Sequence, residues 1–328
     1  MAIFRLTGNV LVQDDVIDPA TVNVTSWADI KDEPAADITR ISHVVNWFKG
    51  DEASNALQAI TAGMIKRAAK FAEYSDGGSA GFRRILGRSL RGSSRAGKPR
   101  LIACVAEKEL DMVPFGFRAA RPLTRSILDL RSFNVPRRLP LLFDILERGA
   151  HSAYQEGFII FTNSDICLMP HFYRSVRDLL SLGIDCLIIN RRTVGQLSAY
   201  GSANKIAMNE VGQRHAGFDC FVFPVAWVER FICTNACVGA GWVMRSLLYN
   251  LVVQAKRMLI MRDAHLTYHF GNDEAWAESK LLDYVAFNLD QARSLLAQLC
   301  VDKHRRALLS AFCQAHQELP QPEPISEP

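Results

Sequence analysis

The spacing of apolar positions changes repeatedly along the chain, and each change predicts a switch between strand and helix. Residues 41–48 form a β-branched and aromatic run, which favours a buried strand. Residues 53–72 carry apolar side chains three and four positions apart, the spacing of an amphipathic helix. The two patterns continue to alternate. Further strands are predicted at 101–106, 126–130, 157–161, 186–190, 218–224 and 257–263, and further helices at 139–148, 175–182, 242–255, 279–299 and 302–316.

This alternation predicts an α/β fold with a mostly parallel central sheet, flanked by helices on both faces. Gly239-Ala-Gly-Trp242 is predicted to be a tight turn, and His265–Asp273 a polar loop. The chain divides into an N-terminal extension at 1–36, a main domain at 37–276, C-terminal helices at 277–316 and a disordered tail at 317–328.

Residues 74–100 differ from the rest of the main domain because they are rich in Gly, Ser and Arg. No acidic residue occurs from Phe82 to Arg100. The plainer interpretation is a solvated insertion loop. The alternative is that residues 83–100 contact anionic lipid headgroups or a polyanionic acceptor.

Charge and hydropathy exclude several classes of protein. The chain has 38 basic and 34 acidic residues, and a net charge of +4 does not indicate a nucleic-acid binder. No apolar run reaches the roughly 18 residues that a membrane-spanning helix needs. Residues 1–13 lack the features of a signal peptide. We therefore expect a cytoplasmic protein whose only membrane contact is peripheral, at the inner face.

Polar side chains follow several of the predicted strands. Asn46 lies near the end of the first predicted strand, Glu107 follows the second, and Asn163-Ser164-Asp165 follows the strand at 157–161. Because ligands of open parallel sheets bind beyond the carboxyl ends of the strands, we expect these residues to converge. A carboxylate there can hold Mg²⁺ or Mn²⁺ beside a diphosphate, which supplies further oxygen ligands. Asp165 is the candidate, with capping of the local turn as the alternative.

These segments resemble the GT-A-fold glycosyltransferases of the nucleotide-diphospho-sugar transferase superfamily, from about Ile41 to about Trp276. Arg138–Glu147 followed by Gly157–Ile166 is similar to the stretch that leads into the family's Asp-x-Asp motif. The motif here reads Asn163-Ser164-Asp165, so its first acid is an amide. The resemblance implies a GT-A-like, Rossmann-related fold. It also implies a hexosyltransferase-like enzyme that uses Mn²⁺ or Mg²⁺, a nucleotide-sugar donor, and a glycan, lipid-linked or small-molecule acceptor.

The resemblance also implies roles for particular residues. His265–Asp273 looks like the C-terminal loop whose histidine completes the metal site, which maps to His269, with His265 as its rival. Gly217–Pro224 looks like the acceptor-side strand, and Gly239-Ala-Gly-Trp242 resembles the turn that follows it. Val243 stands where relatives carry an acid, so the catalytic base is expected elsewhere. The nucleotide-binding candidates are Asn46, Glu107, Arg138 and Asn163, with Arg138 as a charge-assisted donor to the diphosphate.

Asp219 and Asp273 are the candidates for the catalytic base. Asp219 lies in an apolar strand, where an unpaired charge would be costly, so it is either functional or paired with Arg214 or Arg245. The alternative for Asp273 is capping of its turn. Two other functions stay open. A non-catalytic GT-A-like binding domain would explain Asn163 and Val243. A nucleotidyltransferase is less supported, because no glycine-rich basic loop directly follows the first strand.

Overall fold

The structure, a computed structural model, describes residues 3–7, 10–14, 36–74, 97–200, 206–215, 217–271 and 281–316. Its main sheet has nine strands, which lie in the order β1 (Ile3–Thr7), β2 (Val10–Asp14), β12 (Met258–Met261), β8 (Cys186–Ile189), β11 (Cys220–Pro224), β6 (Phe158–Thr162), β3 (Ile41–Asn46), β4 (Arg100–Cys104) and β5 (Arg118–Ala119). Five neighbouring pairs are parallel. β11 runs antiparallel to both β6 and β8. The predicted α/β fold with a mostly parallel sheet is confirmed.

A second sheet of four strands carries the chain beyond the carboxyl ends of the main one. Its order is β10 (Gln213–Arg214), β9 (Arg192–Val194), β13 (Thr267–Phe270) and β7 (Cys167–Leu168). Three short links join the two sheets, at residues 163–166 between β6 and β7, 190–191 between β8 and β9, and 262–266 between β12 and β13. We call these three links the seam.

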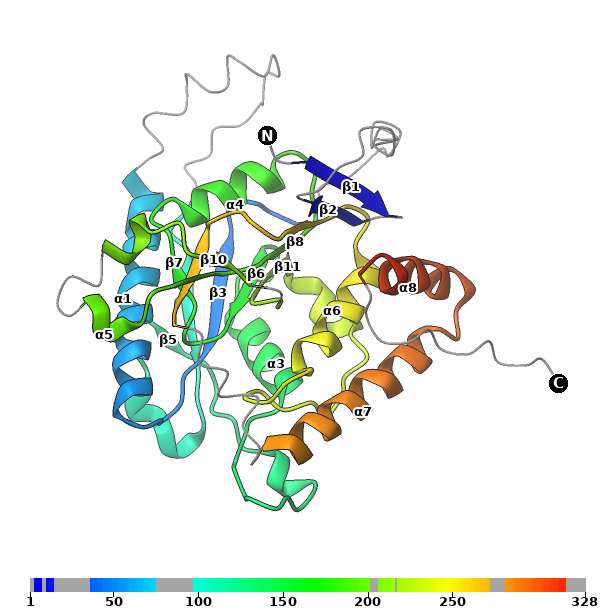
Figure 1. The fold of residues 1–328 in the computed structure, drawn as a ribbon, viewed down its shortest axis with the longest axis horizontal. Coiled ribbons are helices and arrows are strands. Elements are labelled where there is room, and N and C mark those ends of the chain that lie inside the picture. Colours follow the sequence, from blue (N-terminus) through cyan, green and yellow to red (C-terminus); the bar gives the residue numbers. More distant parts are fainter. Residues whose placement is uncertain are drawn as a thin grey trace, which may run out of the picture.

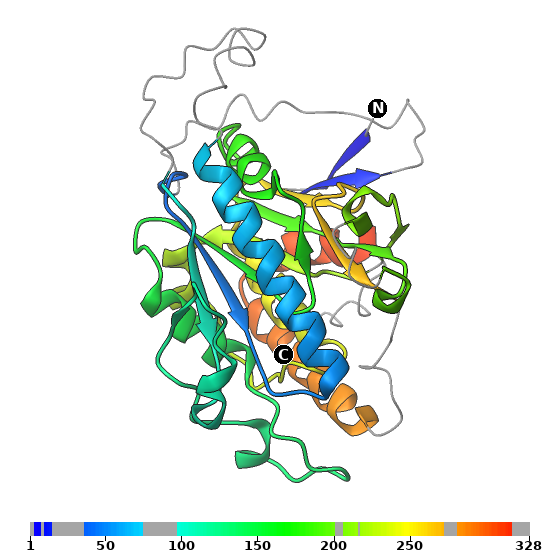
Figure 2. The same ribbon diagram turned by 90° about the vertical axis from the view of Figure 1, so that its left-hand side faces the viewer.

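Helices cover both faces of the main sheet (Figure 1). α1 (Glu52–Tyr74) and α4 (Phe172–Leu180) pack on one face, and α1 also packs against β7. The opposite face is covered by α3 (Leu142–Ser152), α6 (Val243–Gln254), α7 (Leu282–Leu299) and α8 (Lys303–His316). Figure 2 shows α1 in front of the sheet, with α7 and α8 behind it. A short helix, α5 (Leu197–Tyr200), follows β9.

The core explains why the central strands read as unbroken apolar runs. Phe158 and Ile160 of β6 belong to the apolar cluster under α1 and α4, while Ile159 and Phe161 belong to the cluster under α3 and α6. Because helices cover both faces, every side chain of β6 must be compatible with burial. The strand is therefore fixed firmly, and its carboxyl end is delivered to the seam.

Two predictions of local structure were wrong. Residues 126–130 are not a strand, because Ile127–Asp129 form a 3₁₀ turn. The backbone and hydroxyl of Ser126 both donate to Asp129 Oδ2, at 2.6 and 3.0 Å, and this capping favours the turn. Residues 267–270 are a strand rather than part of a polar loop, because β9 and β7 satisfy its backbone on both sides and Tyr268 and Phe270 are buried.

The predicted basic loop falls largely outside the described residues, which resume at Gly97. Its contact with a membrane or a polyanion therefore stays a prediction. Within the described ranges, none of the helices combines the length and the apolar character needed to cross a bilayer.

Candidate functional site

The carboxyl ends of the central strands form a row of polar residues. Val45 of β3 pairs with Thr162 of β6, and Cys220 of β11 pairs with both Thr162 and Ile189 of β8. One position further along, the same register sets four polar residues side by side on neighbouring strands, namely Asn46, Asn163, Asp219 and Asn190. The expected convergence of Asn46 and Asn163 is therefore present at this edge.

Asp165 and His269 meet at the seam. His269 Nε2 lies 3.4 Å from Asp165 Oδ2, although the two residues are far apart in sequence. The His269 side chain is 4% exposed, while that of Asp165 is 38% exposed. A ligand can therefore reach the Asp165 carboxylate, whereas the imidazole ring is covered by protein. β13 holds the imidazole in place, because His269 pairs with Thr193 of β9.

The tautomer of His269 follows from its other ring nitrogen. Nδ1 lies 2.9 Å from the Gly271 carbonyl oxygen, which can only accept, so Nδ1 donates the proton. In the neutral ring Nε2 therefore presents a lone pair to a carboxylate oxygen. Two acceptors at this distance require a proton or a cation between them.

The environment of Asp165 favours its ionised form. Burial raises the pKa of this carboxyl, but the hydrogen bond and charge of His269 and the charge of Arg191 outweigh it, so the net pKa lies below the usual value. Asp165 Oδ1 and Asn163 Oδ1 are both buried and have no hydrogen-bond partner among the described residues. Two buried oxygen acceptors at the strand ends therefore lack a donor among the described residues.

Asp219 is buried, at 6% exposure, and its partner is Arg191. The expectation that it pairs with Arg214 or Arg245 was wrong. Arg214 instead lies 3.8 Å from Asp263, and the Arg245 guanidinium lies over the Phe218 ring at 4.8 Å. The reason is that antiparallel β11 begins beside the end of β8, and Arg191 is the second residue after that end.

Glu107 and Arg138 lie outside both the row of strand ends and the Asp165–His269 pair. Glu107 is exposed at the start of a 3₁₀ helix that follows β4. Arg138 is exposed and forms an ion pair with Asp129 at 3.3 Å. Asn46 uses its amide to bridge strands, since Nδ2 donates to the Cys104 carbonyl at 2.9 Å. Their roles toward a nucleotide stay predictions.

The remaining candidates lie around the same edge. Asp273 lies outside the described residues. His265 is on the 262–266 link in a left-handed conformation, and burial and then the charges of Arg192 and His171 lower its pKa. The predicted turn before α6 is present. Gly239 has φ +98°, and Trp242 has φ 67° although it carries a side chain.

Sequence reasoning missed Asn190 and Arg191. Asn190 ends the buried strand predicted at 186–190 and Arg191 follows it, so the rule that selected Asn46 and Asn163 applies to them equally. Asn190 Oδ1 and Arg191 Nε are buried, and neither has a hydrogen-bond partner in the described part of the chain. Asn190 Nδ2 donates to the His215 carbonyl at 3.3 Å.

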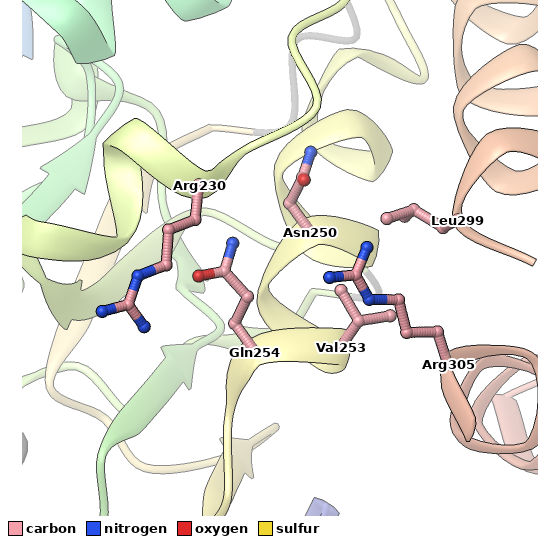
Figure 3. Close-up of a pocket in the computed structure, with 6 residues that line it drawn as sticks. All are labelled: Arg230, Asn250, Val253, Gln254, Leu299 and Arg305. Carbon is pink, nitrogen blue, oxygen red and sulfur yellow. The ribbon is translucent and has the colours of Figure 1, made fainter. Parts of the chain in front are cut away.

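A cavity of about 240 Å³ lies away from the seam (Figure 3). It is lined by Arg230, Asn250, Val253, Gln254, Leu299 and Arg305. Arg230 ends the turn that follows β11, so this cavity is near the opposite end of that strand from Asp219. It therefore contributes nothing to the row of strand ends.

Comparison with known proteins found likeness of fold only. No protein-family model matches the chain, and no curated protein matches its sequence. Among solved structures, S. aureus TarS 1–349 in complex with UDP-GlcNAc is 9% identical, with a TM-score of 0.47 over 84% of this chain and 72% of that one.

Two further solved structures show a similar partial match. A mycobacterial protein is 14% identical, with a TM-score of 0.38 over 80% of each chain. A protein described as a nucleotide-diphospho-sugar transferase from Desulfovibrio desulfuricans G20 is 12% identical, with a TM-score of 0.27 over 78% of this chain and 96% of that one. At these values the likeness says nothing of substrate or reaction.

Proposed function

We propose that this chain is a metal-dependent glycosyltransferase that moves a sugar from a nucleotide-diphosphate sugar to a hydroxyl acceptor. The observation that carries the proposal is the approach of Asp165 and His269 at the carboxyl ends of the strands, with an unpartnered oxygen on Asp165 and another on Asn163. The likeness of fold is compatible with this reaction but does not select it.

The side chains fit a divalent cation that shares its ligands with a diphosphate. Two ligands at right angles around Mg²⁺, each about 2.1 Å from the ion, lie about 3.0 Å apart. Asp165 Oδ2 and His269 Nε2 are 3.4 Å apart, close to that spacing. The described residues contain no group of three or more His, Cys, Asp or Glu that could hold a metal. The ion would therefore depend on phosphate and water oxygens, as Mg²⁺ and Mn²⁺ commonly do.

In this proposal each residue has a limited task. Asp165 and His269 would hold a divalent cation, and that ion would supply positive charge to offset the charge on the leaving diphosphate. Asn163 accepts a hydrogen bond from the ribose or coordinates weakly. Asp219 accepts the proton of the acceptor hydroxyl as that oxygen attacks the anomeric carbon. The proposal for Asp219 is supported by its place in the row of strand ends and by its burial beside the Arg191 guanidinium.

The direct test is hydrolysis or transfer with UDP-, GDP- and TDP-sugars in the presence of Mn²⁺. Asp165→Ala should lower turnover by at least about a hundredfold, because metal stabilisation of a transition state is worth several kcal/mol. Asp178→Ala is the matched control, since this acid is exposed on α4. Unchanged turnover in Asp165→Ala would show that the metal role is wrong.

A non-catalytic binding domain is the second candidate. Two observations favour it, namely the amide at Asn163 and the apolar Val243 after the glycine-aromatic turn. Calorimetry separates the candidates. A glycosyltransferase should bind a nucleoside diphosphate more tightly when Mn²⁺ is present, and a domain without a metal site should show no such dependence.

A further inference from the structure

The Arg191 guanidinium is buried at the seam, and no short ion pair with it occurs among the described residues. Its side chain is 9% exposed, and Asp219 Oδ1 lies 3.8 Å from its Nη1 atom. The backbone nitrogen of Arg191 is 3.4 Å from Asp219 Oδ2. Both distances exceed the 2.7–3.2 Å that is usual for a nitrogen–oxygen hydrogen bond. Nε has no hydrogen-bond partner among the described residues.

Such a charge is expensive to bury. A guanidinium removed from water needs closely paired hydrogen bonds to recover its desolvation cost. The loose contact with Asp219 provides only part of them. Either a ligand completes the set, or the arginine is tolerated at a cost in stability.

The position of Arg191 points to an anionic ligand. It lies on the 190–191 link between β8 and β9, one strand away from the link that carries Asp165, since β11 separates β8 from β6 and β13 separates β9 from β7. Its charge is near enough to lower the pKa of Asp165. The formal charges of Asp165, Asp219 and Arg191 sum to −1 (two acids against one base), which by itself would repel a diphosphate. A divalent cation would change that sum to +1, and Arg191 is what makes it positive.

We infer that Arg191 binds the diphosphate of the donor, with its two-pronged guanidinium on the phosphate oxygens. This inference rests on the proposed function. The chemistry suits the residue, because a guanidinium presents parallel donors that match two phosphate oxygens, and such charge-assisted bonds are among the strongest in proteins.

The test compares ligands that differ only in phosphate. Binding of UDP, GDP and TDP with Mn²⁺ is measured by calorimetry, and binding of the matching nucleosides by ligand-observed NMR. Arg191→Gln should weaken the nucleoside diphosphate by about 10- to 100-fold, the range expected when hydrogen bonds to a charged group are lost. Nucleoside binding should not change. Arg191→Lys should fall between these variants, because it keeps the charge but loses the paired donors.

Arg257→Gln is the matched control. Arg257 is similarly buried, at 9% exposure against 7% for the whole Arg191 residue, but lies at the amino end of the sheet, where Nη1 donates to the Gly183 carbonyl. It should bind the nucleotide as the wild type does. Thermal melts of all variants establish that they are folded.

Two results would overturn the role of Arg191 while leaving the proposed function intact. In one, Arg191→Gln binds the nucleoside diphosphate as tightly as the wild type. In the other, it loses nucleoside and nucleoside diphosphate to the same extent, which would indicate a purely structural part. If the wild type binds none of the three diphosphates with Mn²⁺, the proposed function itself fails, and this inference fails with it.

Discussion

Two buried acids at opposite ends of the main sheet differ in how completely they are satisfied. Asp185 precedes β8, is 8% exposed, and accepts the backbone N–H groups of Lys256 and Arg257 at 2.9 and 3.0 Å. Asp219 lies beside the other end of β8 and is 6% exposed, but its contacts with Arg191 are 3.4 and 3.8 Å long. The carboxylate of Asp185 is used to join the start of β8 to the start of β12. The carboxylate of Asp219 can still accept further hydrogen bonds.

The same contrast extends to the neighbours of Asp219. At the seam and the strand ends, five buried polar atoms have no hydrogen-bond partner among the described residues, namely Asn163 Oδ1, Asp165 Oδ1, Asn190 Oδ1, Arg191 Nε and His265 Nε2. Each such group costs about 1–3 kcal/mol. Several such groups in one place lower the stability of the fold in that region, and this is typical of a binding site.

The largest effect is expected from Asp219→Asn. The amide keeps the shape of the side chain but cannot accept a proton from an acceptor hydroxyl, so turnover should fall by about 10²–10⁴-fold. The free energy of unfolding should fall as well, because the amide leaves the buried Arg191 guanidinium without this counter-charge. The measurement is kcat with the sugar nucleotide identified by the panel.

Asp185→Asn is the control for that experiment. It has nearly the same burial but lies at the other end of the sheet, and it should leave kcat unchanged. Equal losses of kcat in the two variants would mean that general loss of structure, rather than base chemistry, explains both. The comparison between the two acids would then fail.

Stability should show the reverse order. Asp185→Ala removes the acceptor of two short backbone hydrogen bonds and leaves the N–H groups of Lys256 and Arg257 without it. We expect a loss of about 1–3 kcal/mol in the free energy of unfolding, measured by urea denaturation. Asp165→Ala should lose less, since its Oδ1 has no protein partner among the described residues. A larger loss for Asp165→Ala would indicate a structural acid.

Metal affinity should show a smaller effect, but it tests the roles of the two seam residues Asp165 and His269 directly. With only Asp165 and His269 as protein ligands, Mn²⁺ alone should bind weakly, and a nucleoside diphosphate should tighten it by at least about tenfold. His269→Ala should remove most of that gain. Calorimetry of Mn²⁺ with and without the nucleotide measures both effects. Tight binding of Mn²⁺ without nucleotide would require ligands other than these two.

Parts of this site could be read from the sequence because they depend on local pattern. The buried run 157–161 and the polar residues after it predicted a strand with Asp165 just beyond its carboxyl end. The convergence of Asn46 and Asn163 followed from the general geometry of parallel sheets. His269 was assigned from the family resemblance, and the structure places it 3.4 Å from Asp165. Its role as a metal ligand stays a prediction.

Other parts depend on long-range pairing, which local pattern does not contain. Asn190-Arg191-Arg192 offers two adjacent arginines, and nothing in the sequence separates them. In the structure, Arg191 meets Asp219 while Arg192 pairs with Asp263 on the 262–266 link. The antiparallel direction of β11 decides the first pairing. The same limitation explains why β13 was expected to be a loop, since its partners β7 and β9 are distant in sequence.

Asp129 can be compared with the two buried acids, because its carboxylate also accepts hydrogen bonds but is exposed to solvent. The backbone N–H of Ser126, then its hydroxyl, and more weakly Arg138 lower the pKa of Asp129. A carboxyl whose pKa is lower in the folded state adds stability above its unfolded pKa of about 3.9, and this is lost as pH falls through the folded value. Asp129→Asn should therefore lower the Tm slightly at pH 7, and the difference from the wild type should shrink below about pH 4. A difference that stays constant from pH 7 to pH 3 would mean that the charge of Asp129 does not stabilise the turn next to Arg138.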